Sequence, residues 1–177
     1  MLSAFSKNVS GSSSSCPGVH AYPGRGHPPA HLQAIKRAAP SVGVQLQVVE
    51  ARGPEDIDKA ASAFRGRPQA LIVLPSPLMY IQSPALAKLA NKQRLPSISL
   101  FRRFAEAGGL IAYGSDSEES WERFAVLIAK ILSGAKPSDL SIERPSKFEL
   151  LVNLKTAEVL GAKIPESILV RADRIIR

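Results

Sequence analysis

Residues 70–74 show the clearest pattern of apolar and polar positions along the chain. These five consecutive apolar residues, Ala-Leu-Ile-Val-Leu, match a strand that is buried on both faces. Pro75 and Pro77 follow directly, and because proline cannot donate to a strand ladder they predict a turn. Ligand sites of parallel sheets lie in the loops past the carboxyl ends of the strands. Residues 75–80 are therefore the first candidate for a binding loop.

From about residue 30 onward, the chain repeats two kinds of pattern. Apolar runs or alternation predict strands, and apolar positions at helical spacing, bounded by Pro or Gly, predict helices. The longest predicted helix is expected to begin at a capping box of Ser115 and Glu118. We expect it to bury an apolar face made of Trp121, Phe124, Ile128, Ile131 and Leu132. The expected strands are 44–50, 70–74, 95–100, 110–113 and 148–152, and the expected helices are 31–39, one from about 52, 84–91, 118–133, 154–160 and 165–176.

Strands that alternate with helices across short loops are typical of a parallel sheet with helices on both faces. We therefore predict an α/β fold with a flavodoxin-like or Rossmann-like layer. Residues 1–29 differ from the rest, because a Ser-rich and Gly-containing stretch is followed by a segment crowded with Pro, Gly and His. Such a composition buries little apolar surface, so we expect this tail to be disordered.

The chain carries 23 Lys and Arg against 15 Asp and Glu, which gives a net charge of +8. An excess of this kind can attract nucleic acid, anionic lipid or an acidic surface. The basic residues are spread along the whole chain, however, and no zinc-finger or P-loop spacing is present. We therefore expect a solvated basic surface and no nucleic-acid partner. The apolar runs are shorter than the roughly 18–20 residues of a membrane helix, and we recognise no signal peptide.

Three predicted strands, the second, third and fourth, end in loops that a parallel sheet brings to one edge. Aromatic rings there can stack on a ligand, Arg102 can hold a carboxylate, and a helix N-terminus can accept an anion. Plain packing of Phe101 and Tyr113, and a solvated Arg102, are the alternatives that the sequence leaves open. The candidate ligand-binding residues are Ser76, Pro77, Phe101, Arg102, Tyr113, Gly114 and Ser115.

Catalytic and metal chemistry find little support in the sequence. All three His residues, His20, His27 and His31, precede residue 32, so Ser76 has no candidate base in the regular part of the chain. Prolines 28 and 29 lie between His27 and His31 and disfavour a helical pair of metal ligands. We expect no enzyme activity, no metal site and no cofactor.

A series of short motifs follows in a fixed order from about residue 30 to the end of the chain. The motifs include Ala-Arg-Gly-Pro-Glu-Asp at 51–56, Leu-Ile-Val-Leu-Pro-Ser-Pro-Leu at 71–78, Glu-Ala-Gly-Gly-Leu at 106–110, Ile-Leu-Ser-Gly-Ala-Lys-Pro-Ser-Asp-Leu at 131–140, Asn-Leu-Lys-Thr-Ala at 153–157 and Arg-Ala-Asp at 171–173. The order of the motifs is more specific than any one of them. This series resembles the tryptophan/tyrosine-type substrate-binding proteins of ABC transporters.

The resemblance implies a type I periplasmic binding fold, in which two α/β lobes close on a small ligand. It implies a periplasmic component of an ABC importer that binds an amino acid, such as an aromatic one, and passes it to a membrane permease subunit. Residues 30–135 would form one ligand-binding lobe, and residues 136–177 a C-terminal hinge or closing segment. We expect the chain to be truncated, without the first lobe and signal peptide, and to self-associate through the surface so exposed. Family members often carry an acid at the position of Ser76, which puts a salt bridge from this loop to a ligand ammonium in doubt.

Two other functions remain open at this point. One is a cytoplasmic small-molecule-sensing regulatory domain of the same fold, although residues 1–29 contain no helix-turn-helix pattern that would support it. The other is a small α/β hydrolase or transferase, which would need a base near Ser76 or Ser115.

Overall fold

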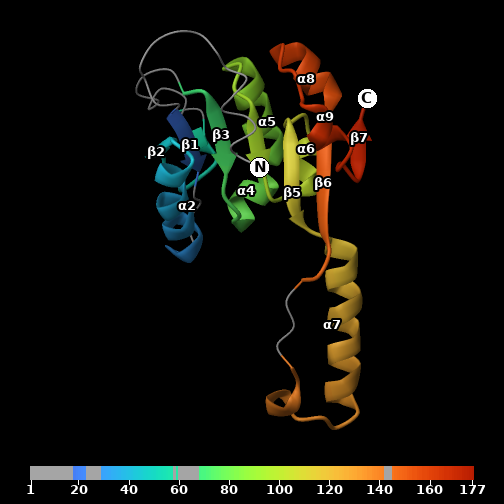
Figure 1. The fold of residues 1–177 in the computed structure, drawn as a ribbon. Coiled ribbons are helices and arrows are strands. Elements are labelled where there is room, and N and C mark those ends of the chain that lie inside the picture. Colours follow the sequence, from blue (N-terminus) through green and yellow to red (C-terminus); the bar gives the residue numbers. More distant parts are fainter. Residues whose placement is uncertain (1–17, 23–28, 58, 60–67, 142–144) are drawn as a thin grey trace.

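The computed structural model describes residues 18–22, 29–57, 59, 68–141 and 145–177, and its centre is a single seven-stranded sheet (Figure 1). The strand order is β2-β1-β3-β4-β5-β6-β7. All neighbouring strands are parallel except β5 and β6, which are antiparallel. The α/β class predicted from the sequence is confirmed, with one antiparallel pair that the pattern did not reveal.

The strands are short and the helices vary widely in length. The strands are β1 (Gly18–Tyr22), β2 (Gln45–Val48), β3 (Ala70–Val73), β4 (Ser97–Ser99), β5 (Ile111–Ser115), β6 (Phe148–Asn153) and β7 (Arg174–Ile176). The helices are α2 (Pro29–Ser41), α4 (Pro77–Ile81), α5 (Ser83–Lys92), α6 (Arg102–Glu106), α7 (Ser117–Leu132), the 3₁₀ turn η1 (Pro137–Asp139), α8 (Leu154–Leu160) and α9 (Glu166–Leu169).

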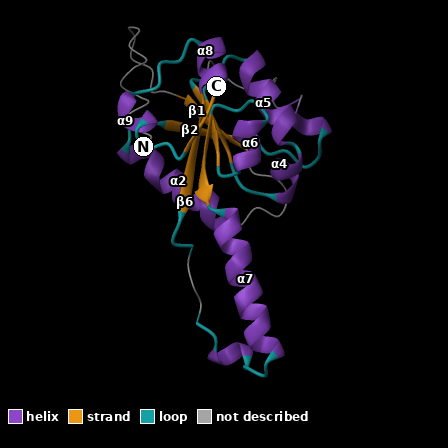
Figure 2. Cartoon of the chain, turned by 90° about the vertical axis from the view of Figure 1, so that its right-hand side faces the viewer, coloured by secondary structure: helices purple, strands orange, loops and turns teal. Residues whose placement is uncertain are grey.

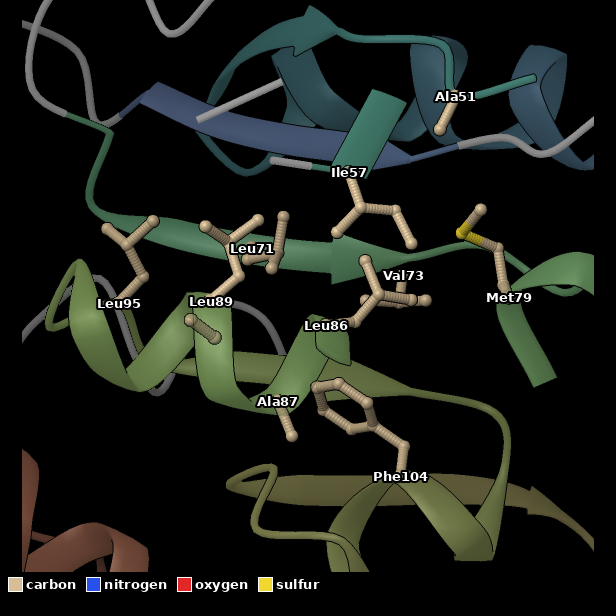
Figure 3. Packing of buried hydrophobic residues seen from close by; sticks show 11 residues of the cluster. Ala51, Ile57, Leu71, Val73, Met79, Leu86, Ala87, Leu89, Leu95 and Phe104 are labelled. Carbon is tan, nitrogen blue, oxygen red and sulfur yellow. The ribbon is translucent and has the colours of Figure 1, made fainter. Parts of the chain in front are cut away.

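Strand β3 is buried on both faces, as the unbroken apolar run predicts. On one face Leu71 and Val73 belong to a cluster that includes residues of α4, α5 and α6, such as Met79 and Phe104 (Figure 3). On the other face Ile72 packs among side chains of α2 and β2. Full burial of one such side chain contributes about 1.5–3 kcal/mol. The central strand therefore joins two core clusters and fixes the position of the loop that follows it.

The carboxyl end of β6 is fixed by a buried asparagine. Asn153 accepts a hydrogen bond from the Thr156 N–H at 3.0 Å, which caps α8, and its amide donates to the Ala105 carbonyl at 2.9 Å. Gly161, at φ +63°, ends α8 in the left-handed conformation that glycine adopts without strain. These bonds connect the start of α8 to α6, at the amino end of β5 and so at the edge of the sheet opposite to the candidate loops.

Two predictions about chain segments are wrong. Residues 18–22, which we expected in the disordered tail, form β1 between β2 and β3. Residues 1–17 and 23–28 lie outside the described residues, and residue 29 begins α2. Residues 165–176, predicted as one helix, divide into α9 and β7. Asp173 causes the change, since its backbone and carboxylate both bond to Leu150 and align the following Ile-Ile pair beside β6. Long-range pairing overrides local composition in both segments.

The predicted buried face of the longest helix is exposed. Helix α7 projects away from the sheet in both views (Figures 1 and 2). Its 16 residues correspond to about 24 Å of length. Trp121 is 72% exposed and Leu132 is 82% exposed, because no described part of the chain covers them. We name the exposed side chains of Trp121, Phe124, Ile128, Ile131 and Leu132 the α7 stripe.

Candidate ligand-binding site

The carboxyl ends of β3, β4 and β5 lie side by side, and a pocket of about 790 Å³ opens there. Pro75, Phe101 and Ser115, one from each of the loops or strand ends singled out in the sequence, contribute to its lining. The parallel register produces this arrangement, since Val73 pairs with Ser99 and Ser99 with Ala112. The three segments thus meet at one site, as predicted for the edge of a parallel sheet.

One wall of the pocket is aromatic. The rings of Tyr80 and Phe101 meet edge to face with their centroids 5.2 Å apart. The Arg103 guanidinium lies over the Tyr80 ring, 5.6 Å from its centroid. Such edge-to-face and cation–π contacts are worth about 0.5–1.5 kcal/mol each. They orient Tyr80, which lies on the short helix after the proline turn and which the sequence analysis did not single out.

Arg102 is held at the pocket by ion pairing. Its Nε lies 2.8 Å from Glu106 Oε1, one turn along α6, and Arg174 Nη1 lies 3.4 Å from the same oxygen. These groups are roughly 40% exposed, so solvent screens the pairs and their contribution to stability is small. Their main effect is geometric, because they restrict the directions in which Arg102 can reach a ligand.

Gly114 forms part of the pocket floor, and the backbone leaves no room for a side chain there. A Cβ at this position would overlap the Leu100 carbonyl oxygen. Gly114 is therefore required where β5 passes the end of β4. A role in packing thus accompanies the predicted role in binding.

Three of the predicted site residues, Ser76, Pro77 and Tyr113, are not part of the pocket lining. Ser76 is buried, and its hydroxyl accepts the Met79 N–H at 3.2 Å, which caps α4. Pro77 is the first residue of that helix. Tyr113 lies on the opposite face of the sheet, where it stacks on Phe148 with centroids 5.8 Å apart. The predicted residues that do line the pocket are Phe101, Arg102, Gly114 and Ser115.

The tertiary structure adds lining residues from distant segments. Glu149 and Leu151 of β6 contribute because β6 pairs with β5 and presents alternate side chains to the same face. Trp121 and Phe124, the first residues of the α7 stripe, also line the pocket. Glu149 is the one polar residue of the predicted strand 148–152, and this was the signal for it, but the identity of its neighbouring strand did not follow from the sequence. Ser115 ends β5 instead of capping the helix, which begins two residues later.

An ionic network fixes the base of α7 to the strand that returns to the sheet. Lys147 Nζ lies 2.8 Å from Asp116 Oδ2, and the Lys147 N–H donates to Glu119 Oε2 at 3.0 Å. Arg123 Nη2 lies 3.0 Å from Glu119 Oε1, which also accepts from the Ser146 hydroxyl. The Ser146 bond is the main cause that lowers the pKa of Glu119, and the Asp116 carboxylate raises the pKa of Lys147.

We expect acid to loosen the base of α7. The pKa of Glu119 is lower in the folded chain than its usual value of 4.5, so its contribution to stability is present above pH 4.5. That contribution is lost as the pH falls through the lowered pKa. Trp121, the single tryptophan of the chain, lies two residues away and reports on the change. Fluorescence anisotropy should decrease below pH 4.5 in the natural chain, and Glu119→Gln should show the low-pH value at neutral pH. An unchanged anisotropy in that variant would contradict the assignment.

The described residues contain no group of three or more His, Cys, Asp or Glu arranged to hold a metal ion. Nor does any described helix have the length and apolar character needed to cross a bilayer. Of the three histidines, His31 lines the pocket, while the side chains of His20 and His27 are outside the described part.

Residues 23–176 match the model of a protein family described as ABC transporter substrate binding protein. The chain belongs to this family. Its members are substrate-binding proteins and not enzymes, in agreement with the expectation drawn from the motifs. A curated relative, the tyrosine-binding protein of Clostridioides difficile (strain R20291), is 24% identical over 105 residues, which are 59% of this chain and 30% of the relative.

Solved structures show the same fold at low sequence identity. A conserved domain protein from Vibrio cholerae superposes with a TM-score of 0.83 at 22% identity, over 89% of this chain and 54% of that one. An ABC domain from Streptococcus pneumoniae in complex with L-Trp gives a TM-score of 0.83 at 21% identity, over 90% and 55%. A ligand-free, open substrate-binding protein with adhesive properties from Clostridium difficile gives 0.65 at 19% identity, over 90% and 54%. The family member described here thus spans about half the length of these structures.

Proposed function

We propose that this chain is the ligand-recognising lobe of an ABC importer's solute-binding component and that it binds an amino acid in the pocket at the ends of β3, β4 and β5. The observation that carries the proposal is the meeting of these strand ends around one pocket of about 790 Å³. Volumes of roughly 300–1,000 Å³ are usual for small-molecule sites. Family membership and the amino acids named for the relatives, tyrosine and L-Trp, support this ligand class.

The lining of the pocket suits an aromatic amino acid. Tyr80 and Phe101 offer ring surfaces for an aromatic side chain, and Arg102 or Arg103 offers a guanidinium for the carboxylate. Ser115 completes the lining at the end of β5. Arg102 and Glu106 fix one another and so prepare this part of the pocket before the ligand binds. Ser76, which caps α4, acts on recognition through the position of Tyr80.

We propose that a second α/β lobe supplies the opposite wall of the cleft and covers the α7 stripe. The solved relatives contain nearly as much chain again as the part that matches this one. The α7 stripe begins inside the pocket at Trp121 and Phe124 and continues along the projecting helix. A lobe that packed on the stripe would therefore also close the open side of the pocket. Residues 136–177 would act as the closing segment, since they return from α7 to complete the sheet with β6 and β7.

The importer role implies a location and a partner. We propose that the complete protein works outside the cytoplasmic membrane, in the periplasm of a cell that has one, and delivers its ligand to the permease subunit of an ABC transporter. The regulatory alternative has less support, because the matching family is one of transporter components.

A titration followed by NMR tests the proposal. Two-lobed sites enclose about 70–90% of a ligand's surface, whereas one wall encloses much less. We therefore expect L-tryptophan or L-tyrosine to bind the chain with a dissociation constant in the millimolar range, about −4 kcal/mol. Shifts should be confined to backbone signals of pocket residues such as Phe101, Ser115 and Trp121. An absence of shifts with all the amino acids would contradict amino-acid binding, and nanomolar affinity would contradict the need for a second wall.

A further inference from the structure

Glu149 places a carboxylate at the pocket on a strand that the predicted binding loops do not include. It is the second residue of β6, it is half-buried, and it lines the pocket. In the antiparallel pairing of β5 and β6 it lies directly opposite Gly114. Side chains of one face alternate along a strand, so Glu149 and Leu151 share a face with Ala112. The carboxylate therefore stands over the same floor as the strand-end loops.

No side chain from the neighbouring strand covers Glu149. Directly opposite residues of an antiparallel pair have Cβ atoms about 4.5–5.5 Å apart and usually cover one another. The residue opposite Glu149 is Gly114, and the space that a side chain would occupy there is filled by the Leu100 carbonyl. A ligand group can therefore reach the Glu149 carboxylate from the pocket that this residue lines.

The other charged groups of the pocket have interactions within the protein. Glu106 pairs with Arg102 and Arg174, and Arg103 lies over the Tyr80 ring. Among the described residues, none forms a hydrogen bond or ion pair with the Glu149 side chain. In a chain with an excess of positive charge, a half-buried carboxylate in this position is available to a cation from outside.

We propose that Glu149 binds the protonated amino group of the ligand and thereby makes the site select amino acids over carboxylic acids that lack the amine. This inference rests on the proposed function of the pocket. It assigns the two charges of the ligand to different segments, with the ammonium on β6 and the carboxylate on the Arg102 side. It also explains how the site recognises an ammonium although the loop after β3 carries Ser76, whose hydroxyl caps α4.

Paired ligands test the assignment by NMR titration of the full chain. The probes are L-tryptophan and indole propionate, which has the same ring and carboxylate but no amino group. Hydrogen bonds to charged groups are worth about 1.5–3 kcal/mol. We expect the natural chain to bind L-tryptophan roughly 10- to 100-fold more tightly than indole propionate. Glu149→Gln should remove this preference by weakening only the L-tryptophan complex.

Two further variants control the comparison. Glu158→Gln changes the same charge on the exposed side of α8, away from the pocket, and should keep the full preference. Glu149→Asp keeps the carboxylate and should retain part of it. Circular dichroism establishes that each variant folds, so the Asp variant still tests the role of the charge if the Gln variant is unstable.

The outcomes separate the inference from the function on which it rests. If Glu149→Gln keeps the preference, or if the natural chain binds both compounds equally, the assignment of Glu149 is wrong while aromatic binding in the pocket stands. If neither compound shifts any pocket signal, the proposed function itself fails, and the inference fails with it.

Discussion

Gly114→Ala should destabilise the fold by about 1–3 kcal/mol or more, in the range of overpacked cores. The new methyl group would overlap the backbone oxygen of Leu100, and a backbone atom cannot rotate away as a side chain can. Strand β5 would have to separate from the end of β4, where Ser99 pairs with Ala112. Because this point is also the pocket floor, binding of L-tryptophan should weaken together with stability. Urea unfolding followed by far-UV circular dichroism measures the change.

The neighbouring residue provides the control for this substitution. Ser115→Ala removes a hydroxyl from an exposed side chain and should change the free energy of unfolding by no more than about 0.5 kcal/mol. If Gly114→Ala were as stable as the natural chain, β5 could move away from the Leu100 carbonyl without a loss of stability. That result would contradict the packing role of Gly114.

Replacing the α7 stripe should abolish self-association of the isolated chain. The variant carries Trp121→Gln, Phe124→Gln and Ile128→Gln, three exposed apolar side chains on one face of α7. Without a covering lobe, we expect copies to associate through this face. Removing the three groups should weaken the free energy of self-association by roughly 3 kcal/mol or more, which raises the dissociation constant over 100-fold. Glutamine keeps the helix propensity, so the fold should remain intact. Sedimentation equilibrium measures the association.

A matched variant on the polar side of the same helix isolates the effect. Glu122→Gln combined with Lys130→Gln changes two exposed side chains and leaves the net charge unaltered. It should associate like the natural chain. The interpretation of the α7 stripe as an interface would be abandoned if the natural chain were monomeric at all concentrations, or if both variants lost association equally.

The sequence predicted residues of the pocket lining where local patterns and strand direction were enough. The apolar run before Pro75 identified β3, and the order of strands and helices placed three strand ends at one edge. Phe101, Arg102, Gly114 and Ser115 reached the pocket lining on that basis. Ser76 and Tyr113 did not. Ser76 caps the short helix α4, which the sequence pattern did not predict. Tyr113 faces the other side of the sheet, and the face on which a strand residue lies depends on how the strand pairs with its neighbours.

The sequence by itself determined the α/β class, the family resemblance and the edge of the sheet at which the ends of β3, β4 and β5 meet. These properties follow from apolar periodicity, proline and glycine positions and motif order, all of which are local. Only the tertiary structure decided that residues 18–22 and 174–176 are strands, that β6 runs antiparallel to β5, and that Glu149 stands beside Gly114. It also decided that the apolar face of α7 is uncovered. The physical reason is common to all of these: pairing and burial depend on what lies opposite a segment, and an amphipathic pattern indicates that a partner is needed without specifying which part of the protein supplies it.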